Sequence, residues 1–212
     1  MLYKGECAQA EVIATNLQGS PDHPRAAQLI ATLGQLSGRI EKMLQLARAE
    51  AGLGLARTRT DLVAVTRLVA EDYARRPQIG ARLTFDAGPD QSLMVAIDPD
   101  ALGIALQNLI DNALSHGTRG ATIEVAIGPG ATARIVNDGP AISPATLAKL
   151  KNRFERAGRR SATGAGLGLA IVEEIMRQAG GRLELFSPAR DRHEGFEAML
   201  IFSTMPAPSS PK

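Results

Sequence analysis

The sequence predicts an α+β protein: a two-layer α/β sandwich with a mixed sheet, preceded by an antiparallel helical hairpin that dimerises into a four-helix bundle. Three observations support this prediction. Before residue 52 the apolar residues recur with heptad spacing, which is typical of helices that pack against a partner. After residue 61 short strand pairs alternate with three helices, which favours helices on one face of a sheet. Hydrophobic residues make up 44% of the 212 residues, enough to fill a sizeable core.

Residues 8–50 are expected to form two helices around a break at 19–24, which contains one glycine and two prolines. A lone hairpin cannot bury its apolar stripe, so we expect a homodimer that completes a four-helix bundle. A hairpin that packs on its own globular domain is the alternative. The apolar positions of the second helix step by 4, 3, 4, 3 and 4 residues: Leu29, Leu33, Leu36, Ile40, Met43 and Ala47.

The rest of the chain divides into a linker at 53–60, a globular domain at 61–204 and a tail at 205–212 that is expected to be disordered. Asp61 is a suitable cap for the first helix of this domain, and Asp98-Pro99 starts the second. The expected elements are, in order, a helix at 61–76, strands at 82–86 and 93–97, a helix at 99–115, strands near 121–127 and 132–137, a short helix after Ser143, a helix at 167–179, and strands at 182–187 and 196–203.

Composition excludes several classes of protein. The single cysteine, Cys7, excludes a disulfide framework and a cysteine zinc site, and it fits a reducing compartment. A formal net charge of +2 argues against a nucleic-acid surface. Neither a run of about 20 apolar residues nor a signal peptide occurs in the sequence. We therefore expect a cytoplasmic chain without a membrane segment of its own. If the protein works at a membrane, its anchor lies outside these residues.

A run of alternating glycines, Gly164, Gly166 and Gly168, opens directly into the helix expected at 167–179. Glycines let the backbone approach an anion, and a helix N-terminus supplies free N–H groups. An ordinary turn is the alternative. The run is not a Walker loop, because no Gly-Lys-Ser/Thr follows it, and its spacing does not fit a dinucleotide fingerprint.

The helix at 99–115 carries two asparagines four residues apart, Asn108 and Asn112, with Ser115 and His116 one turn further on. Amides at the border of a buried stripe need hydrogen-bond partners, which the neighbouring backbone can provide. Alternatively, their oxygens coordinate a hard cation such as Mg²⁺, which is also coordinated by substrate phosphates.

Four segments in this order resemble the ATP-binding domain of sensor histidine kinases, within the gyrase–Hsp90–histidine kinase–MutL ATPase superfamily. Residues 108–116 resemble its asparagine box, 137–142 its first glycine box, 153–156 its phenylalanine box and 164–171 its second glycine box. The resemblance covers residues 61–204 and implies the histidine kinase-like ATPase fold. It also implies that ATP and Mg²⁺ bind, with 140–163 as a mobile lid.

The resemblance assigns a task to each matching residue. Asn112 would coordinate Mg²⁺ with Asn108 in support, and Asn137 stands where an acidic residue usually accepts from the adenine amino group. Ala141 replaces a glycine of the family pattern, and Phe154 would anchor the lid. The implied ATP-binding residues are Asn108, Asn112, Ser115, His116, Asn137, Gly139, Ala141, Ile142, Phe154, Arg156, Gly164, Gly166, Leu167, Gly168 and Leu169.

By the same resemblance, residues 1–52 are a partial dimerisation and phosphotransfer hairpin whose acceptor segment is missing. The implied function is transfer of the ATP γ-phosphate to a histidine outside this chain, for relay to a response regulator receiver domain. A pseudokinase module that binds nucleotide or a response regulator without phosphoryl transfer is the alternative. Another ATPase of the superfamily is a third hypothesis, which the heptad hairpin disfavours. Residues 149–160 carry a net charge of +5, which we interpret as facing ATP, with a solvated basic helix as the alternative.

Overall fold

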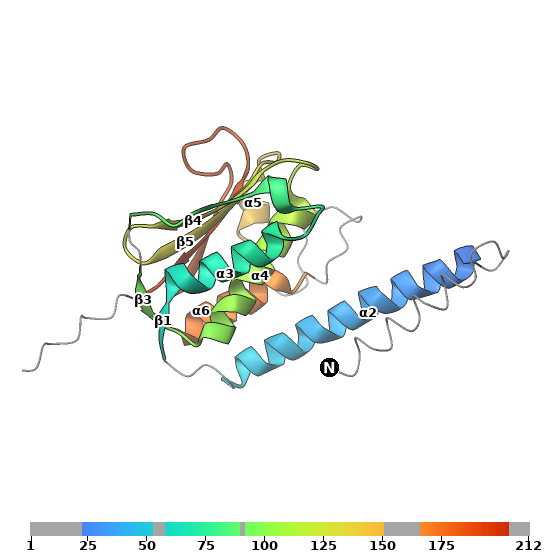
Figure 1. Ribbon diagram of the computed structural model, residues 1–212, viewed down its shortest axis with the longest axis horizontal. Coiled ribbons are helices and arrows are strands. Elements are labelled where there is room, and N and C mark those ends of the chain that lie inside the picture. The colour runs from blue at the N-terminus through green and yellow to red at the C-terminus, as the bar shows by residue number, and fades with distance from the viewer. Residues whose placement is uncertain (1–22, 53–57, 90–91, 151–165, 204–212) are drawn as a thin grey trace, which may run out of the picture. The chain divides into compact units, whose positions relative to one another are not determined.

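The computed structural model describes residues 23–52, 58–89, 92–150 and 166–203 (Figure 1). The chain forms two compact units, Met1–Gln45 and Leu46–Lys212, which are described separately below. The first helix of the expected hairpin, most of the expected linker and the tail at 205–212 lie outside the described residues. Within the described part of the chain, no helix is long and apolar enough to cross a bilayer.

The helix α2, His23–Glu50, is the second helix of the expected hairpin. Pro24 lies in its first turn, where the missing backbone N–H costs nothing. The heptad residues of this helix are exposed to solvent rather than buried. The exposed fractions are 64% for Leu29, 55% for Leu33, 48% for Leu36, 51% for Ile40 and 56% for Met43.

Five strands form the main sheet in the order β2-β4-β5-β7-β6. The strand β2 runs parallel to β4 and every other pair is antiparallel, so the predicted mixed sheet is confirmed. The end of β5 lies between its neighbours, because Asn137 pairs with Ile123 on one side and Phe196 on the other. The strands are β2 (Leu83–Asp86), β4 (Ile123–Gly128), β5 (Thr132–Asn137), β6 (Arg182–Phe186) and β7 (Phe196–Ile201).

A second sheet of two strands stands beside the first. The strand β3, Met94–Ala96, was expected from the sequence, but it pairs with β1, Arg59–Asp61, instead of joining the main sheet. No strand was expected at 59–61, because three residues are too few to display an alternating pattern. The hydroxyl of Thr60 donates to the carbonyl of Ile97 and fastens the pair.

Three helices cover one face of the main sheet: α3 (Leu62–Ala74), α4 (Pro99–His116) and α6 (Gly168–Gln178) (Figure 1). Two of them begin at an aspartate whose side chain accepts from the first backbone N–H groups, Asp61 for α3 and Asp98 for α4. Two short elements complete the fold, the 3-10 turn η1 (Gly80–Arg82) and the helix α5 (Pro144–Leu147), which starts after Ser143 as expected.

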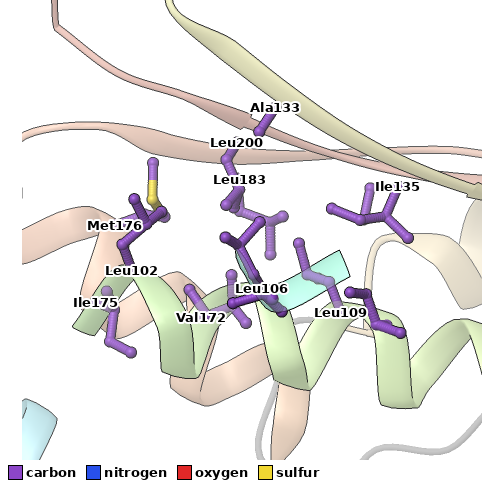
Figure 2. Packing of buried hydrophobic residues seen from close by; sticks show 14 of the residues in the cluster. Leu102, Leu106, Leu109, Ala133, Ile135, Val172, Ile175, Met176, Leu183 and Leu200 are labelled. Atoms are coloured by element: carbon purple, nitrogen blue, oxygen red, sulfur yellow. The ribbon is translucent and has the colours of Figure 1, made fainter. Parts of the chain in front are cut away.

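The core lies between these helices and the sheet (Figure 2). Leucines at 102, 106 and 109 of α4 repeat on one helical face and are almost fully buried. They pack with Val172, Ile175 and Met176 of α6 beneath Ala133, Ile135, Leu183 and Leu200 of the strands. This packing sets α4 and α6 side by side, and both helices carry residues of the candidate site.

Candidate functional site

Asn108 of α4 is a buried amide with an unsatisfied oxygen. Its side chain is 4% exposed, and its Nδ2 donates to the carbonyl of Ile104 at 2.9 Å. The oxygen, Oδ1, has no hydrogen-bond partner among the described residues. Because buried polar atoms in proteins are nearly always paired, an orphan carbonyl oxygen here indicates a group that is supplied from elsewhere.

The start of α6 lies directly against this oxygen. A Cβ on Gly168, the first residue of α6, would lie 3.3 Å from Asn108 Oδ1, closer than an ordinary van der Waals contact. Gly166 has a φ of +68°, which favours glycine, and Leu167 at the N-cap position is buried and provides no side-chain cap. Among the described residues, the N-cap side chain therefore leaves the first backbone N–H groups of α6 uncapped, beside Asn108, in a position suited to an anion.

The turn after β5 lies against the other end of α4. Asn137, the last residue of β5, is 4% exposed, and its Nδ2 donates to the carbonyl of Asp138 at 3.2 Å. The same carbonyl accepts from the backbone N–H of Thr118 at 2.8 Å. A Cβ on Gly117 would come within 3.0 Å of Asn137 Nδ2, so only a glycine lets the turn approach α4 this closely.

Asn112 lies on α4 between these two regions. It is half-buried and comes one turn after Asn108, whereas Ser115 is exposed and His116 is half-buried at the helix end. From Asn108 to His116 the helix advances by about 12 Å, at 1.5 Å per residue. The asparagine helix therefore forms one continuous edge, with the start of α6 at one end and the turn of residues 137–142 at the other.

Hydrogen bonds from the connection between β6 and β7 hold the turn of residues 137–142. Gly139 is buried and its carbonyl accepts from the backbone N–H of Gly195 at 2.7 Å, while Ile142 donates its backbone N–H to Ser187 Oγ at 2.8 Å. Ala141, at the position where the family pattern has a glycine, is exposed. Ile142 packs against the core, so the turn is fastened at both of its ends.

Three of the site residues expected from the sequence, Phe154, Arg156 and Gly164, lie outside the described residues. The basic cluster at 149–160 is described only at Lys149 and Leu150. The remaining expected residues are described, and Leu167 and Leu169 are both buried members of the core around the start of α6.

Sequence reasoning missed a tyrosine that holds the asparagine helix. Tyr73 of α3 donates its hydroxyl to Asp111 Oδ1 at 2.7 Å, and Asp111 stands next to Asn112. Burial, followed by the carboxylate of Asp111, raises the pKa of Tyr73, so the phenol remains a donor. Only tertiary contact joins these residues, which are 38 positions apart, and their local sequence contains no signal for it.

Sequence reasoning also missed the arginine that pairs with the turn. Arg192 lies in the connection between β6 and β7. Its guanidinium donates hydrogen bonds to Asp138 Oδ1 at 2.9 Å and to Glu124 Oε1 at 2.5 Å. The hydrogen bond to Glu124 raises the pKa of the Arg192 guanidinium, so it stays charged.

Residues 97–207 match the family model described as histidine kinase-, DNA gyrase B-, and HSP90-like ATPase. The chain is 35% identical over 179 residues to a probable sensor histidine kinase, HK, of Mycobacterium tuberculosis strain CDC 1551 / Oshkosh; the match covers 84% of this chain and 45% of the relative. The chain therefore spans less than half the length of this relative.

A second relative is closer to this chain in length. "Sensor histidine kinase component HK1" of M. tuberculosis strain H37Rv is 36% identical over 149 residues, which are 69% of this chain and 84% of the relative. Among solved structures, the mycobacterial sensor histidine kinase MprB superposes with a TM-score of 0.55 at 27% identity, over 70% of this chain and 99% of that one.

Proposed function

The chain belongs to the histidine kinase-, DNA gyrase B- and HSP90-like ATPase family, and on this premise we propose that it is the ATP-binding catalytic core of a two-component sensor histidine kinase. The reaction is transfer of the γ-phosphate of ATP to a histidine, for relay to a response regulator receiver domain. One observation supports this most strongly: the orphan oxygen of Asn108 lies against the uncapped start of α6.

The nucleotide runs along the edge formed by α4. Its triphosphate meets the backbone N–H groups at the start of α6, around Gly166 and Gly168, where the helix dipole favours negative charge. Its base meets the turn of residues 137–142, where the amide of Asn137 accepts from the adenine amino group. Ser115 and His116 contact the nucleotide from the end of α4 nearer the turn of residues 137–142, and Phe154, Arg156 and Gly164 belong to the lid.

The residues on this edge fit Mg²⁺. Amide oxygens are suitable ligands for a hard cation, and Mg²⁺ in proteins is held by a few such groups together with substrate phosphates. Asn112 holds the ion, and Asn108 supports it from one turn earlier with an oxygen that has no partner among the described residues. When bound, the ion neutralises charge on the phosphates.

Catalysis by this chain consists of positioning. In phosphoryl transfer the protein takes little part in covalent bond changes. The rate therefore depends on holding the γ-phosphate in line with the attacking nitrogen. The attacking histidine is neutral, since only an unprotonated imidazole nitrogen has a free lone pair. The proposed acceptor histidine lies outside residues 1–212, on a helical bundle of the phosphotransfer type.

The proposed organisation is a cytoplasmic homodimer. Residues 1–52 form the dimerising hairpin, 53–60 the linker and 61–204 the catalytic domain. The exposed heptad residues of α2 support dimerisation, because apolar side chains of this size at regular spacing are normally covered. The pseudokinase alternative has no support in the names of the two relatives described above, both of which are named sensor histidine kinases.

The first test is nucleotide binding by the full chain. We expect ATP to bind with an affinity that rises with Mg²⁺, and Asn112→Ala to reduce both the affinity and its dependence on Mg²⁺. Gln107→Ala is the matched control, because Gln107 is exposed on the same helix. Equal affinity and equal Mg²⁺ dependence in Asn112→Ala and the wild type would show that the site assignment is wrong.

The second test is transfer. Helical bundles that carry an acceptor histidine, taken from other sensor histidine kinases, are incubated with the chain and γ-labelled ATP. We expect acid-labile label on the bundle, and none when the acceptor histidine is replaced by glutamine. ATP binding without label on any bundle would favour the pseudokinase alternative.

A further inference from the structure

The connection between β6 and β7, residues 187–195, is bonded at three points to the turn of residues 137–142. Ser187 Oγ accepts from the backbone N–H of Ile142 and donates to the carbonyl of Gly195 at 3.0 Å. Gly195 in turn donates its N–H to Gly139. Segments more than 40 residues apart in sequence therefore form one unit at the base-binding end of the proposed site.

Arg192 makes the third contact, and it is the one that reaches the main sheet. Its guanidinium bridges Asp138 of the turn and Glu124 of β4. Glu124 lies opposite Val136 in the register of β4 and β5, one position before Asn137. The bridge therefore fixes the start of the turn against β4, a strand that packs on the hydrophobic core.

The two neighbouring side chains of the turn face different surroundings. Asn137 is buried against the end of α4, whereas the side chain of Asp138 is 52% exposed and meets Arg192. Because consecutive side chains of extended backbone point to opposite sides, holding Asp138 outward holds Asn137 inward. Asn137 Nδ2 donates one of its two N–H groups to the carbonyl of Asp138, and Oδ1 is the acceptor that this side chain can offer to a ligand.

We propose that Arg192 is a positioning residue for nucleotide selection: through Asp138, it holds the turn so that Asn137 presents its carbonyl oxygen to the base. The inference rests on the proposed function, in which this turn meets the base. An acceptor oxygen selects adenine, whose amino group donates, over guanine, whose O6 at the corresponding position accepts. When Arg192 is absent, the turn loosens, the amide of Asn137 can rotate, and selection weakens.

The test measures the affinities of the full chain for Mg-ATP and Mg-GTP in the wild type, Arg192→Ala and Arg192→Lys. For Arg192→Ala we expect ATP binding to weaken by about three- to fivefold, the upper part of the range for loss of exposed ion pairs. GTP binding is expected to change by less, so that the ratio of the two affinities falls. Arg192→Lys is expected to be intermediate, since an ammonium can pair with Asp138 but cannot bridge two carboxylates as a guanidinium does.

Arg182→Ala is the matched control, because Arg182 forms an ion pair with Glu184 on an edge strand and does not touch the turn. Urea unfolding without nucleotide is measured for each variant. The urea concentration at the midpoint is expected to be similar for Arg192→Ala and Arg182→Ala. A double-mutant cycle with Asp138→Ala tests the route: if Arg192 acts through Asp138, the double variant binds ATP no more weakly than Arg192→Ala.

Three results would overturn the inference: ATP affinity within about twofold of the wild type in Arg192→Ala, equal loss for ATP and GTP, or additive losses in the cycle. Equal loss for both nucleotides is the result of a merely structural arginine. A wild-type chain that binds no ATP would instead overturn the proposed function, and this inference with it.

Discussion

At the scale of single residues, the candidate site contains a buried oxygen that has no partner among the described residues. Asn108 is buried with an unsatisfied oxygen, and Gly168 leaves just enough space beside it for a close approach. A buried oxygen without a partner costs about 1–3 kcal/mol of stability. The fold carries this cost at the position where the family resemblance puts the metal and the phosphates, as expected for a binding site.

Gly195 shows a residue whose replacement distinguishes steric contact from backbone strain. Its φ is +94°, and a Cβ there would lie 2.9 Å from the carbonyl oxygen of Asn137. Gly120 has a similar φ of +87° but nothing within 4 Å of an added Cβ. We expect Gly120→Ala to lower the free energy of unfolding by about 1 kcal/mol through backbone strain alone.

Gly195→Ala is expected to lower the free energy of unfolding by more than Gly120→Ala does, by roughly 2–4 kcal/mol, because the steric clash adds to the backbone strain. Urea unfolding of the two variants and the wild type provides the measurement. Equal losses in the two variants would mean that Asn137 and the turn move aside freely, contrary to a turn fastened at both ends.

At the scale of elements, helix α3 depends on the carboxylate of Asp61. This group is the N-cap of α3, and it also accepts from the backbone N–H of Leu93 at 3.2 Å, next to β3. Burial raises the pKa of Asp61, but hydrogen bonds from Ser92, Leu93, Ala64 and Val63 outweigh it and hold the pKa below its usual value. One carboxylate therefore joins the small sheet to the first helix of the domain.

Asp61→Ala is expected to lower the free energy of unfolding by about 1 kcal/mol at neutral pH, the usual value of an N-cap. Since the folded-state pKa is lower than the unfolded one, the stabilisation from the charge is present above about pH 4 and is lost as the pH falls through the folded-state pKa. Asp61→Asn, which keeps an acceptor but cannot titrate, is the control.

Urea unfolding at several pH values between about 3 and 7 tests this dependence. The deficit of Asp61→Asn relative to the wild type should shrink toward acid pH. A deficit that stays constant or grows toward acid pH would contradict a carboxylate whose pKa is lowered by folding.

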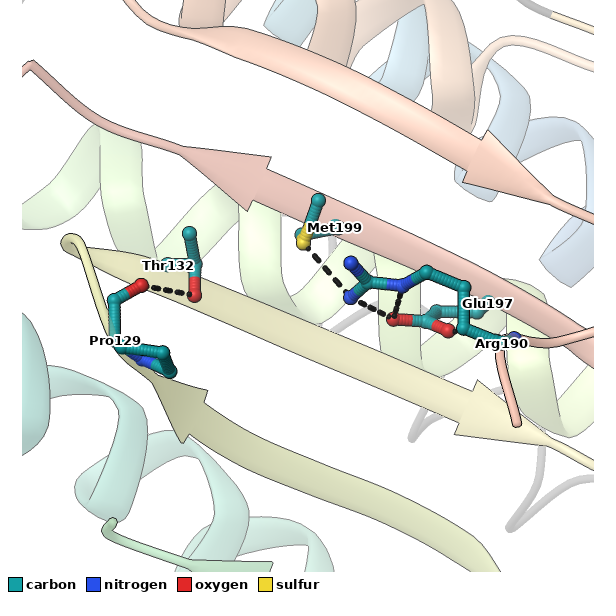
Figure 3. A network of polar contacts seen from close by, with 5 residues as sticks. All are labelled: Pro129, Thr132, Arg190, Glu197 and Met199. Carbon is teal, nitrogen blue, oxygen red and sulfur yellow. Dashed lines mark hydrogen bonds and ion pairs between the residues drawn. The ribbon is translucent and has the colours of Figure 1, made fainter. Parts of the chain in front are cut away.

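The strand β7 contributes a buried carboxylate to an ion pair with Arg190 on the face of the sheet opposite the helices (Figure 3). Glu197 is fully buried and accepts from Arg190 Nη2 at 2.6 Å and from the Arg190 backbone N–H at 3.1 Å. The guanidinium lies 4.8 Å from the ring centre of Phe186, and its Nη2 is 3.0 Å from Met199 Sδ. This pair joins the middle of the 187–195 connection to β7.

Arg190→Ala is expected to lower the free energy of unfolding by roughly 2–4 kcal/mol, because it leaves a buried carboxylate without its charged partner. The double variant Arg190→Met with Glu197→Leu should recover most of the loss, since apolar side chains of similar volume avoid the cost of desolvation. Chemical unfolding of both variants is the measurement, and a double variant as unstable as Arg190→Ala would contradict this account.

At the scale of the whole molecule, the exposed heptad face of α2 is the surface that we expect to form the dimer. If that face forms the dimer, Ile40→Asp should convert the chain to a monomer, because a carboxylate at an apolar heptad position cannot be buried without a partner. Ala31→Asp is the control, since Ala31 is exposed on the opposite side of the helix. Sedimentation velocity at several concentrations reports the mass of each variant.

A monomeric wild-type chain, or a dimer that survives Ile40→Asp, would contradict dimerisation through this face. Helical circular dichroism of Ile40→Asp separates loss of the dimer from loss of the helix.

The sequence by itself determined the elements and their class. Capping aspartates at 61 and 98, heptad spacing in α2 and alternating apolar strands act within a few residues, so local patterns were enough to predict helices, strands and a mixed sheet. The four motif segments also pointed to the ATPase family, because their residue types and order are local properties too. The strand at 59–61 was missed because its pairing with β3 has no local signal.

Only the tertiary structure decided which side chains meet. The contact of Asn108 with Gly168, the bond from Tyr73 to Asp111 and the bridge from Arg192 to Glu124 and Asp138 join residues 38 to 68 positions apart. Such contacts follow from how the helices and strands pack around a shared core, and packing depends on the fit of all the buried side chains together. For this reason the sequence could place the asparagines and glycines in their motifs, whereas the positioning arginine became visible only in the folded chain.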